Sequence, residues 1–303
     1  MPGDPLSDDR WEALLAVRAE RPEAVALAYA RRTTRPLLGA DGRLLLVAAD
    51  HPARGALAVG DRPDAMADRR SLLERLCAAL TRPGVDGLLA TPDIVEDLLL
   101  LGALDGRVVI GSMNRGGLAG AAWELDDPVT AYTPAAIAAA GLDGGKLLVR
   151  IDDADPGTRP TLEACGAAVT ALAESRRMAM LEPLPYRRDG DGRSRLDADP
   201  DRLVRAVAIA SGLGATSART WLKLPATAEA PRVLGATTLP CVLLGGDVGP
   251  DRDATHGAWQ QALGLPNARG LVVGRALLYP PDGDVAGAVD AAARLVHGAG
   301  VAV

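Results

Sequence analysis

The two lysines are the residues of this chain that most clearly suggest chemistry. Of its 33 lysine and arginine residues, all but Lys146 and Lys223 are arginine. An amine can lose its proton, attack a carbonyl carbon and form an imine, whereas a guanidinium stays protonated. Both lysines lie in apolar runs, GGKLLVR and TWLKLP. The pattern predicts that an amine is required and favours Lys223 as the nucleophile; the alternative is that either lysine simply pairs with a carboxylate.

Two carboxylates come directly after other apolar runs. Asp50 follows LLLVAA and is itself followed by His51, and Glu182 follows MAML. Asp50 could instead form a turn, given Pro52 and Gly55 after it. Glutamate is a poor turn residue, and a buried glutamate needs a partner. An acid–base role beside a lysine amine is therefore the prediction for Glu182 and Asp50.

Glycines and an arginine close the last two apolar runs of the chain. Gly245 and Gly246 follow CVLL, and Gly274 and Arg275 follow GLVV. Backbone N–H groups of such glycines, together with a cation, commonly bind phosphate in the last two loops of a barrel. The spacing predicts a phosphate site at these four residues.

Other catalytic motifs do not occur in the sequence. The three histidines, His51, His256 and His297, show no HxH or HExxH spacing, which disfavours a zinc mechanism. No GxSxG, Walker A or CxxC motif is present. We expect neither a metal ion nor a cofactor.

The elements that must position these residues repeat along the chain as a short apolar run, a turn and an Ala/Leu-rich helix. Continuous apolar runs are typical of strands buried on both faces. Eight strands are predicted, at 44–49, 87–90, 108–111, 146–151, 178–181, 220–224, 241–244 and 270–273. Helices are predicted at 64–81, 92–103, 134–140, 158–175, 200–213, 226–236, 253–263 and 284–297. Three of these helices begin with a cap residue before proline, at Thr91, Thr133 and Asp199.

Eight β/α units without a break in composition predict an α/β protein that is one closed (β/α)8 TIM barrel. We expect a single domain over 1–303, in which 1–40 form a helical extension with an extra helix near 8–31. A doubly wound open sheet is the alternative, but it would normally have fewer units, and no GxGxxG follows the first strand.

Composition excludes several classes of partner. The net charge is −6 and no basic tract occurs, which argues against nucleic acid. No signal peptide and no apolar run of membrane-spanning length is found. The three cysteines are far apart, as expected of reduced thiols in a cytoplasmic protein. A small phosphorylated sugar is the expected ligand, and the extra helix could mediate a homo-oligomer.

Several short segments resemble those of class I aldolases. They are AADHP, GGKLLVRID, MLEPL, TWLKLP and VVGRALLYP. Over about residues 40–297 the chain is similar to tagatose-bisphosphate aldolases and archaeal-type fructose-bisphosphate aldolases. With its GSMNRGGLAGA segment, it most resembles an actinobacterial branch described as deoxyribose-phosphate aldolase-like and found with inositol-catabolism genes.

The resemblance implies a role for each matching position. Lys223 would form the Schiff base, with Glu182 moving protons and Asp50 taking the hydroxyl proton as the C–C bond breaks. Lys146 would be the second lysine of the site, and Gly274 with Arg275 would bind phosphate. The chain departs from tagatose aldolases at His51, where a glutamine is expected, and at Arg150-Ile-Asp152, where tyrosines are expected.

The inositol-linked branch implies a particular substrate, 6-phospho-5-dehydro-2-deoxygluconate, cleaved to dihydroxyacetone phosphate and malonate semialdehyde. Its carboxylate would need a cation, for which Arg54, Arg115 and Arg150 are candidates. Fructose or tagatose bisphosphate and deoxyribose phosphate remain alternative substrates. From other classes, a catalytically silent phosphosugar-binding barrel and an imine-free lyase or decarboxylase also stay open.

Overall fold

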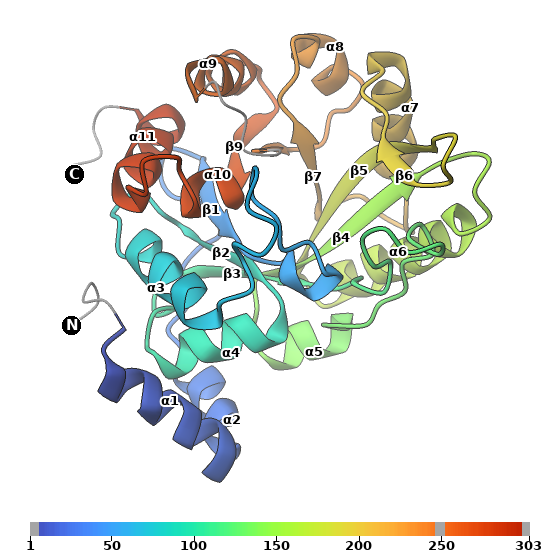
Figure 1. Cartoon of the computed structure of the whole chain (residues 1–303). Coiled ribbons are helices and arrows are strands. Elements are labelled where there is room, and N and C mark those ends of the chain that lie inside the picture. The colour runs from blue at the N-terminus through green and yellow to red at the C-terminus, as the bar shows by residue number, and fades with distance from the viewer. Residues whose placement is uncertain (1–5, 246–251, 299–303) are drawn as a thin grey trace.

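Eight parallel strands close into a barrel in the computed structural model, which describes residues 6–245 and 252–298 (Figure 1). Each of these strands pairs with the next one along the chain, and the last pairs with the first, so the barrel is closed. The strands are β1 (Leu44–Ala48), β2 (Gly87–Ala90), β3 (Val108–Ser112), β4 (Gly144–Ile151), β5 (Met178–Arg188), β7 (Thr220–Pro225), β8 (Cys241–Leu244) and β9 (Ala268–Val273). The predicted (β/α)8 barrel is confirmed.

Helices follow the strands and cover the outside of the barrel. They are α3 (Arg69–Leu80), α4 (Pro92–Leu100), α5 (Pro134–Ala139), α6 (Thr158–Glu174), α7 (Pro200–Ser211), α8 (Ala230–Leu234), α9 (Arg252–Leu263), α10 (Arg275–Leu278) and α11 (Val285–His297), with a short 3-10 turn η1 (Pro52–Arg54). The side chains of Thr133 and Asp199 accept hydrogen bonds from the first turns of α5 and α7, as their sequences predict. Among the described residues, no helix is both long and apolar enough to cross a membrane.

Strand β5 is longer than its apolar run predicts. It continues through Glu182 to Arg188 and turns back as β6 (Ser194–Leu196), an antiparallel hairpin that the sequence analysis missed. Pro183 and Pro185 hid the extension, because proline donates no ladder hydrogen bond. The Asp-Gly pairs between the two strands are the signal that could have revealed the hairpin.

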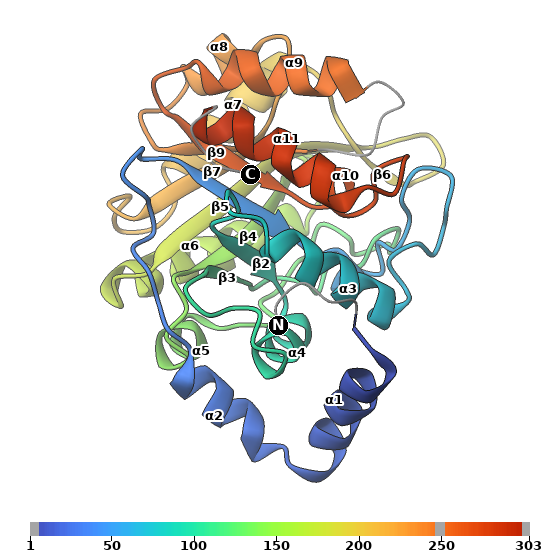
Figure 2. The same cartoon turned by 90° about the vertical axis from the view of Figure 1, so that its left-hand side faces the viewer.

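The amino-terminal extension contains two helices where one was expected over 8–31. Helix α1 (Asp8–Glu20) stops before Pro22, and α2 (Glu23–Arg31) starts after it, because proline disfavours a helical residue before it. Both lie outside the barrel, on the side of α4 (Figure 2). Arg18 of α1 is paired with Asp97 of α4 at 2.7 Å, which anchors the extension to the barrel.

Residues alternate along each strand between two apolar layers. One set points into the barrel and the other packs against the helices, as a period of two requires. The inner set comprises Leu44, Leu46, Ala48, Leu89, Val108, Ile110, Met178, Met180, Trp221, Val242 and Val272. The lumen is thus filled with side chains and leaves room for function only at the carboxyl ends of the strands.

Candidate functional site

The alternation along the strands brings the predicted catalytic residues into one layer. Asp50 is two residues beyond the inward-facing Ala48, Glu182 two beyond Met180, and Lys223 two beyond Trp221. Lys146 is paired in register with Met180, so its side chain faces inward too. Four polar side chains from β1, β4, β5 and β7 therefore form the top layer of the lumen.

Direct contacts join these four side chains into a chain of ion pairs. Lys223 Nζ donates to Glu182 Oε1 at 2.6 Å. The other carboxylate oxygen of Glu182 is paired with Lys146, whose Nζ also lies 3.2 Å from Asp50 Oδ2. All four residues are buried. The structure thus brings together the two lysines and the two carboxylates that the sequence singled out.

Asp50 has two further partners, both from the end of β3. Ser112 Oγ donates to Asp50 Oδ2 at 3.0 Å, and Arg115 Nη1 lies 3.1 Å from the same oxygen. Ser112 is two residues beyond the inward-facing Ile110 and is buried. Ser112 was not among the residues predicted from the sequence, although a polar residue at the end of an apolar strand is a signal that could have revealed it.

The carboxyl groups are held as anions by this arrangement. Burial would raise the pKa of Asp50, but Lys146 and Arg115 outweigh it and hold the pKa well below its usual range. Burial is likewise opposed at Glu182, where Lys146 and Lys223 lower the pKa of the carboxyl. Burial lowers the pKa of Lys146, against the opposite effect of Asp50 and Glu182. The site thus keeps both carboxylates ionised beside Lys146, an amine whose charge is costly to bury.

His51 connects the ion-pair chain to the end of β9. Its Nδ1 lies 3.9 Å from Asp50 Oδ1, too far for a hydrogen bond. Burial, with Arg275 and the two lysines nearby, lowers the pKa of His51 to about 3 despite Asp50. His51 is therefore neutral at physiological pH, and it stands between the carboxylate and the predicted phosphate loop.

Gly274 allows the end of β9 to approach β1 closely. A Cβ atom at this position would lie 2.4 Å from the Ala48 carbonyl oxygen and 2.9 Å from the His51 ring. Only glycine fits such an approach. Arg275, the next residue, begins α10. The predicted Gly-Arg pair thus lies beside His51 and Asp50, at the mouth of the barrel.

Gly245 also occupies a crowded position. A Cβ there would lie 2.5 Å from Val273 Cγ1, so the chain leaving β8 passes close to β9. Gly246, the other predicted phosphate ligand of this loop, lies outside the described residues.

Arg150 stands apart from the top layer of the lumen. It is four residues beyond Lys146 on β4, which places it roughly 13 Å farther along the strand. Its guanidinium is completely buried and is paired with Glu124 at 2.8 Å and Asp127 at 3.0 Å. It also donates to the Gly117 carbonyl oxygen at 3.0 Å. The structure thus places Arg150 as a brace for the loop between β3 and α5, and does not bring it together with the other predicted site residues.

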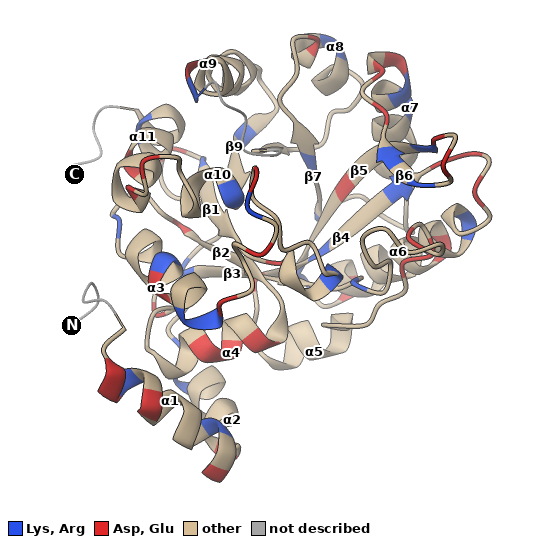
Figure 3. Ribbon diagram, viewed as in Figure 1, with Lys and Arg blue, Asp and Glu red and all other residues tan. Residues whose placement is uncertain are grey.

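Charge is otherwise concentrated on the outside of the protein. Figure 3 shows blue and red segments mostly on the outer helices and loops, with isolated coloured segments on inner strands such as β5 and β7. Burying a charge is expensive unless it is paired. A chain of paired charges at the carboxyl end of the barrel is therefore the place to look for function.

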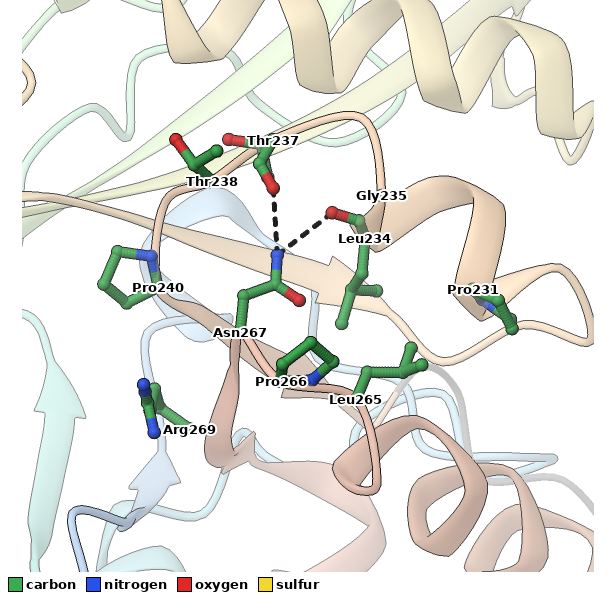
Figure 4. Close-up of a pocket in the computed structure, with 10 residues that line it drawn as sticks. All are labelled: Pro231, Leu234, Gly235, Thr237, Thr238, Pro240, Leu265, Pro266, Asn267 and Arg269. Carbon is green, nitrogen blue, oxygen red and sulfur yellow. Dashed lines mark hydrogen bonds between the residues drawn. The ribbon is translucent and has the colours of Figure 1, made fainter.

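A cavity of about 440 Å³ lies at the other end of the barrel (Figure 4). Its lining includes Pro240, just before β8, and Asn267, just before β9. The Asn267 side-chain amide donates to the Leu234 and Thr237 carbonyl oxygens and so braces the loop before β8. The amino-terminal end of such barrels generally serves stability, and this cavity is separate from the ion-pair chain.

Comparison with known proteins identifies a family and a similar solved structure. The family described as Cgl0159-like matches residues 42–293. The crystal structure of Cgl0159 from Corynebacterium glutamicum is 54% identical over 97% of this chain and 99% of its own, with a TM-score of 0.94. None of the curated proteins matches the sequence.

More distant solved structures share the fold. An archaeal fructose 1,6-bisphosphate aldolase is 17% identical over 90% of this chain and 99% of its own, with a TM-score of 0.62. Fructose-bisphosphate aldolase from Slackia heliotrinireducens is 15% identical over 98% of this chain and 94% of its own, with a TM-score of 0.56. At this identity the likeness concerns the barrel alone.

Proposed function

This chain belongs to the Cgl0159-like family, and we propose that it is a class I aldolase whose Lys223 forms a Schiff base with a phosphorylated sugar or sugar acid. The observation that carries the proposal is the bridge formed by Glu182. One carboxylate oxygen contacts Lys223 Nζ at 2.6 Å, and the other contacts Lys146. An amine that must lose a proton, a carboxylate beside it to take that proton, and a second cation to stabilise the carboxylate are the groups that imine chemistry requires.

Imine formation follows from this bridge. Glu182 Oε1 accepts a proton from Lys223 Nζ, and the free amine adds to the substrate carbonyl carbon. A second proton moves from the nitrogen to the alkoxide oxygen and gives the neutral carbinolamine. Glu182 then returns the proton to the hydroxyl of the carbinolamine, which leaves as water. Lys223 has one carboxylate partner and Lys146 has two, which favours Lys223 as the amine that is released for attack.

Carbon–carbon cleavage uses Asp50, on the other side of Lys146. Its carboxylate takes a proton from a substrate hydroxyl. This hydroxyl is on the carbon that leaves as the aldehyde, and its oxygen becomes the aldehyde carbonyl oxygen. The electron pair of the broken bond moves to the iminium nitrogen and leaves an enamine on Lys223. Asp50 releases its proton to solvent, and Glu182 takes up a solvent proton and delivers it to the enamine carbon. Water then adds to the resulting iminium and releases the ketone product and the Lys223 amine, so protons and electrons balance.

The phosphate end of the substrate is assigned to the last two loops. Arg275 and the N–H groups around Gly245 and Gly274 lie at the mouth of the barrel beside the ends of β8 and β9, where such barrels commonly bind phosphate. This geometry supports a phosphorylated substrate in general.

The substrate that we propose to test first is 6-phospho-5-dehydro-2-deoxygluconate. Among the three arginines considered for its carboxylate, Arg150 has its charge taken up by Glu124 and Asp127. Arg115 shares Asp50 with Lys146. Arg54 lies 4.0 Å from Glu124, which it shares with Arg150. Each of these two arginines thus has one shared carboxylate, and both remain as candidates. Fructose and tagatose bisphosphates and deoxyribose phosphate are the alternatives to compare with it.

Covalent trapping tests the proposal directly. Incubation with dihydroxyacetone phosphate followed by borohydride should add one reduced adduct, which peptide mapping should place on Lys223. Lys223→Arg should be as inactive as Lys223→Ala, because arginine retains the charge but cannot form an imine. Lys146 is the only competing lysine in the chain, so the site of attachment can be assigned without ambiguity.

Each other outcome has a definite meaning. An adduct on Lys146 would exchange the roles of the two lysines. Absence of any adduct, together with an active Lys223→Arg variant, would refute the imine mechanism and leave an imine-free lyase. A protein that binds the phosphosugars but cleaves none of them would be the silent binding barrel.

A further inference from the structure

We infer that Ser112 is a positioning residue, which holds one oxygen of Asp50 so that the other, Oδ1, is the atom that receives the substrate proton. The inference rests on the proposed aldolase function and adds to it the atom that acts as base and the residue that orients it.

Three side chains lie around the same oxygen of Asp50, and two of them, Ser112 and Lys146, donate a hydrogen bond to it. Ser112 Oγ lies 3.0 Å from Oδ2, Arg115 Nη1 3.1 Å and Lys146 Nζ 3.2 Å. They come from two neighbouring strand ends, since Ser112 on β3 is paired in register with Lys146 on β4. A carboxylate oxygen has about two lone-pair directions, and the hydrogen bonds from Ser112 and Lys146 occupy them. Arg115 Nη1 donates to the Asp50 main-chain carbonyl oxygen and adds its charge beside Oδ2. Oδ2 is therefore unsuited to accept another proton.

The other oxygen of Asp50 is in a different situation. Among the described residues, no hydrogen bond to Oδ1 is found, and the ring nitrogen of His51 is 3.9 Å away. Asp50 as a whole is buried, but Oδ1 is not among the buried atoms of the described residues that lack a hydrogen-bond partner. This oxygen therefore keeps some access to solvent, as an atom that meets a substrate must. A substrate hydroxyl that donates to Oδ1 would complete the set and lie in position for proton transfer.

Ser112 has a different effect from its two charged neighbours. Arg115 and Lys146 stabilise the negative charge of Asp50 from several directions, because charge attraction depends weakly on angle. A hydroxyl donates one hydrogen bond along one direction. Ser112 is completely buried as the last residue of β3, where its main chain is held in register with Lys146. Its hydrogen bond therefore fixes the rotation of the carboxylate, which decides where Oδ1 points.

The test compares two reactions of one variant, Ser112→Ala. Cleavage of the C–C bond needs Asp50, whereas exchange of the α-protons of dihydroxyacetone phosphate with solvent needs only Lys223 and Glu182. For whichever of the bisphosphates or 6-phospho-5-dehydro-2-deoxygluconate the wild type cleaves, we expect kcat to fall roughly 10-fold or more, with KM unchanged, as for loss of a hydrogen bond to a charged group. Proton exchange and borohydride trapping should stay at the wild-type rate.

A matched control separates positioning from loss of stability. Ser211→Ala removes a partly buried hydroxyl far from the site, which donates to the Val207 carbonyl oxygen on α7 and contacts the Thr237 hydroxyl, and it should affect neither reaction. If Ser112→Ala slows exchange and cleavage equally, or slows neither, Ser112 does not position the base and the inference is overturned. If the wild type itself forms no adduct, the proposed function fails, and this role fails with it.

Discussion

At the scale of single residues, the site depends on how two lysines share their carboxylates. Lys146 bridges Asp50 and Glu182, while Lys223 contacts Glu182 alone. Arginine could form the same ion pairs, and arginine is used at every other lysine or arginine position of the chain. Retention of amines at two adjacent buried positions is explained if at least one of them must become neutral and react.

Arg275 gives a prediction at the same scale. Removing its charge with Arg275→Ala should raise KM for a phosphorylated substrate roughly 10- to 100-fold, with a much smaller change in kcat, as for loss of a charge-assisted pair. Steady-state kinetics check this. Arg159→Ala, which removes a well exposed arginine, is the control for net charge. If Arg275→Ala binds inorganic phosphate as tightly as the wild type, the phosphate site lies elsewhere.

At the scale of elements, the loop between β3 and α5 is held by a buried ion cluster. Arg150, from β4, reaches Glu124 and Asp127 in this loop, and both carboxylates are buried. The same loop carries Arg115, which contacts Asp50. Arg150 therefore acts on the site through the course of the loop, and its effect should appear first in stability.

Arg150→Met should lower the free energy of unfolding by about 3–5 kcal/mol, because it leaves the buried Asp127 without its cation and Glu124 with Arg54 alone, at 4.0 Å. Denaturant unfolding in the absence of substrate measures this. Arg195→Met, which breaks an exposed pair with Asp189, should stay close to the wild type. A stable Arg150→Met protein with a raised KM would instead support the sequence-based assignment of Arg150 to the substrate.

At the scale of the whole molecule, a histidine joins the last helix to the first strands of the barrel. His297, at the end of α11, contacts Asp41 just before β1 at 2.5 Å and lies 3.4 Å from Asp86 just before β2. Asp86 and Asp41 raise the pKa of His297 against the opposite effect of burial. Protonated His297 therefore helps to close the barrel at its amino-terminal end.

The raised pKa predicts a definite pH dependence. The stabilisation by His297 is fully present below the unfolded-state pKa of about 6.5 and is lost as pH rises through the higher folded-state pKa. His297→Gln should thus cost on the order of 1 kcal/mol at pH 6, and the difference from wild type should shrink as pH rises. Thermal unfolding of both proteins at about pH 5.5 to 9 measures how this stability difference changes with pH.

His256 provides the matched control for this measurement. Burial, together with Arg252, lowers the pKa of His256, so its contribution has the opposite sign and is lost as pH falls. His256→Gln should therefore reduce the loss of stability on the acid side. A difference between His297→Gln and wild type that grows with pH would contradict the assigned ion pairs.

Much of this molecule was determined by local sequence. The eight apolar runs and the caps at Thr133 and Asp199 predict the barrel, because burial on both faces and helix starts depend on neighbouring residues. Asp50, Glu182 and Gly274 were predicted to lie at the mouth of the barrel because each directly follows an apolar run. Where neighbouring signals conflicted, as at the prolines within β5, the prediction of the strand was too short.

Only the tertiary structure decided which of these polar residues meet. Whether a side chain at a strand end joins the top layer of the lumen depends on which face of the sheet it occupies and on the register between strands. Neither can be read from the apolar run of one strand. Register brings Ser112 beside Lys146 and both onto Asp50. Arg150 lies on the same face of β4 as Lys146 but farther along the strand. There it is paired with Glu124 and Asp127, which come from a loop whose course the sequence pattern does not predict. Sequence selects the residue types of the site, and the closure of the barrel sets their distances.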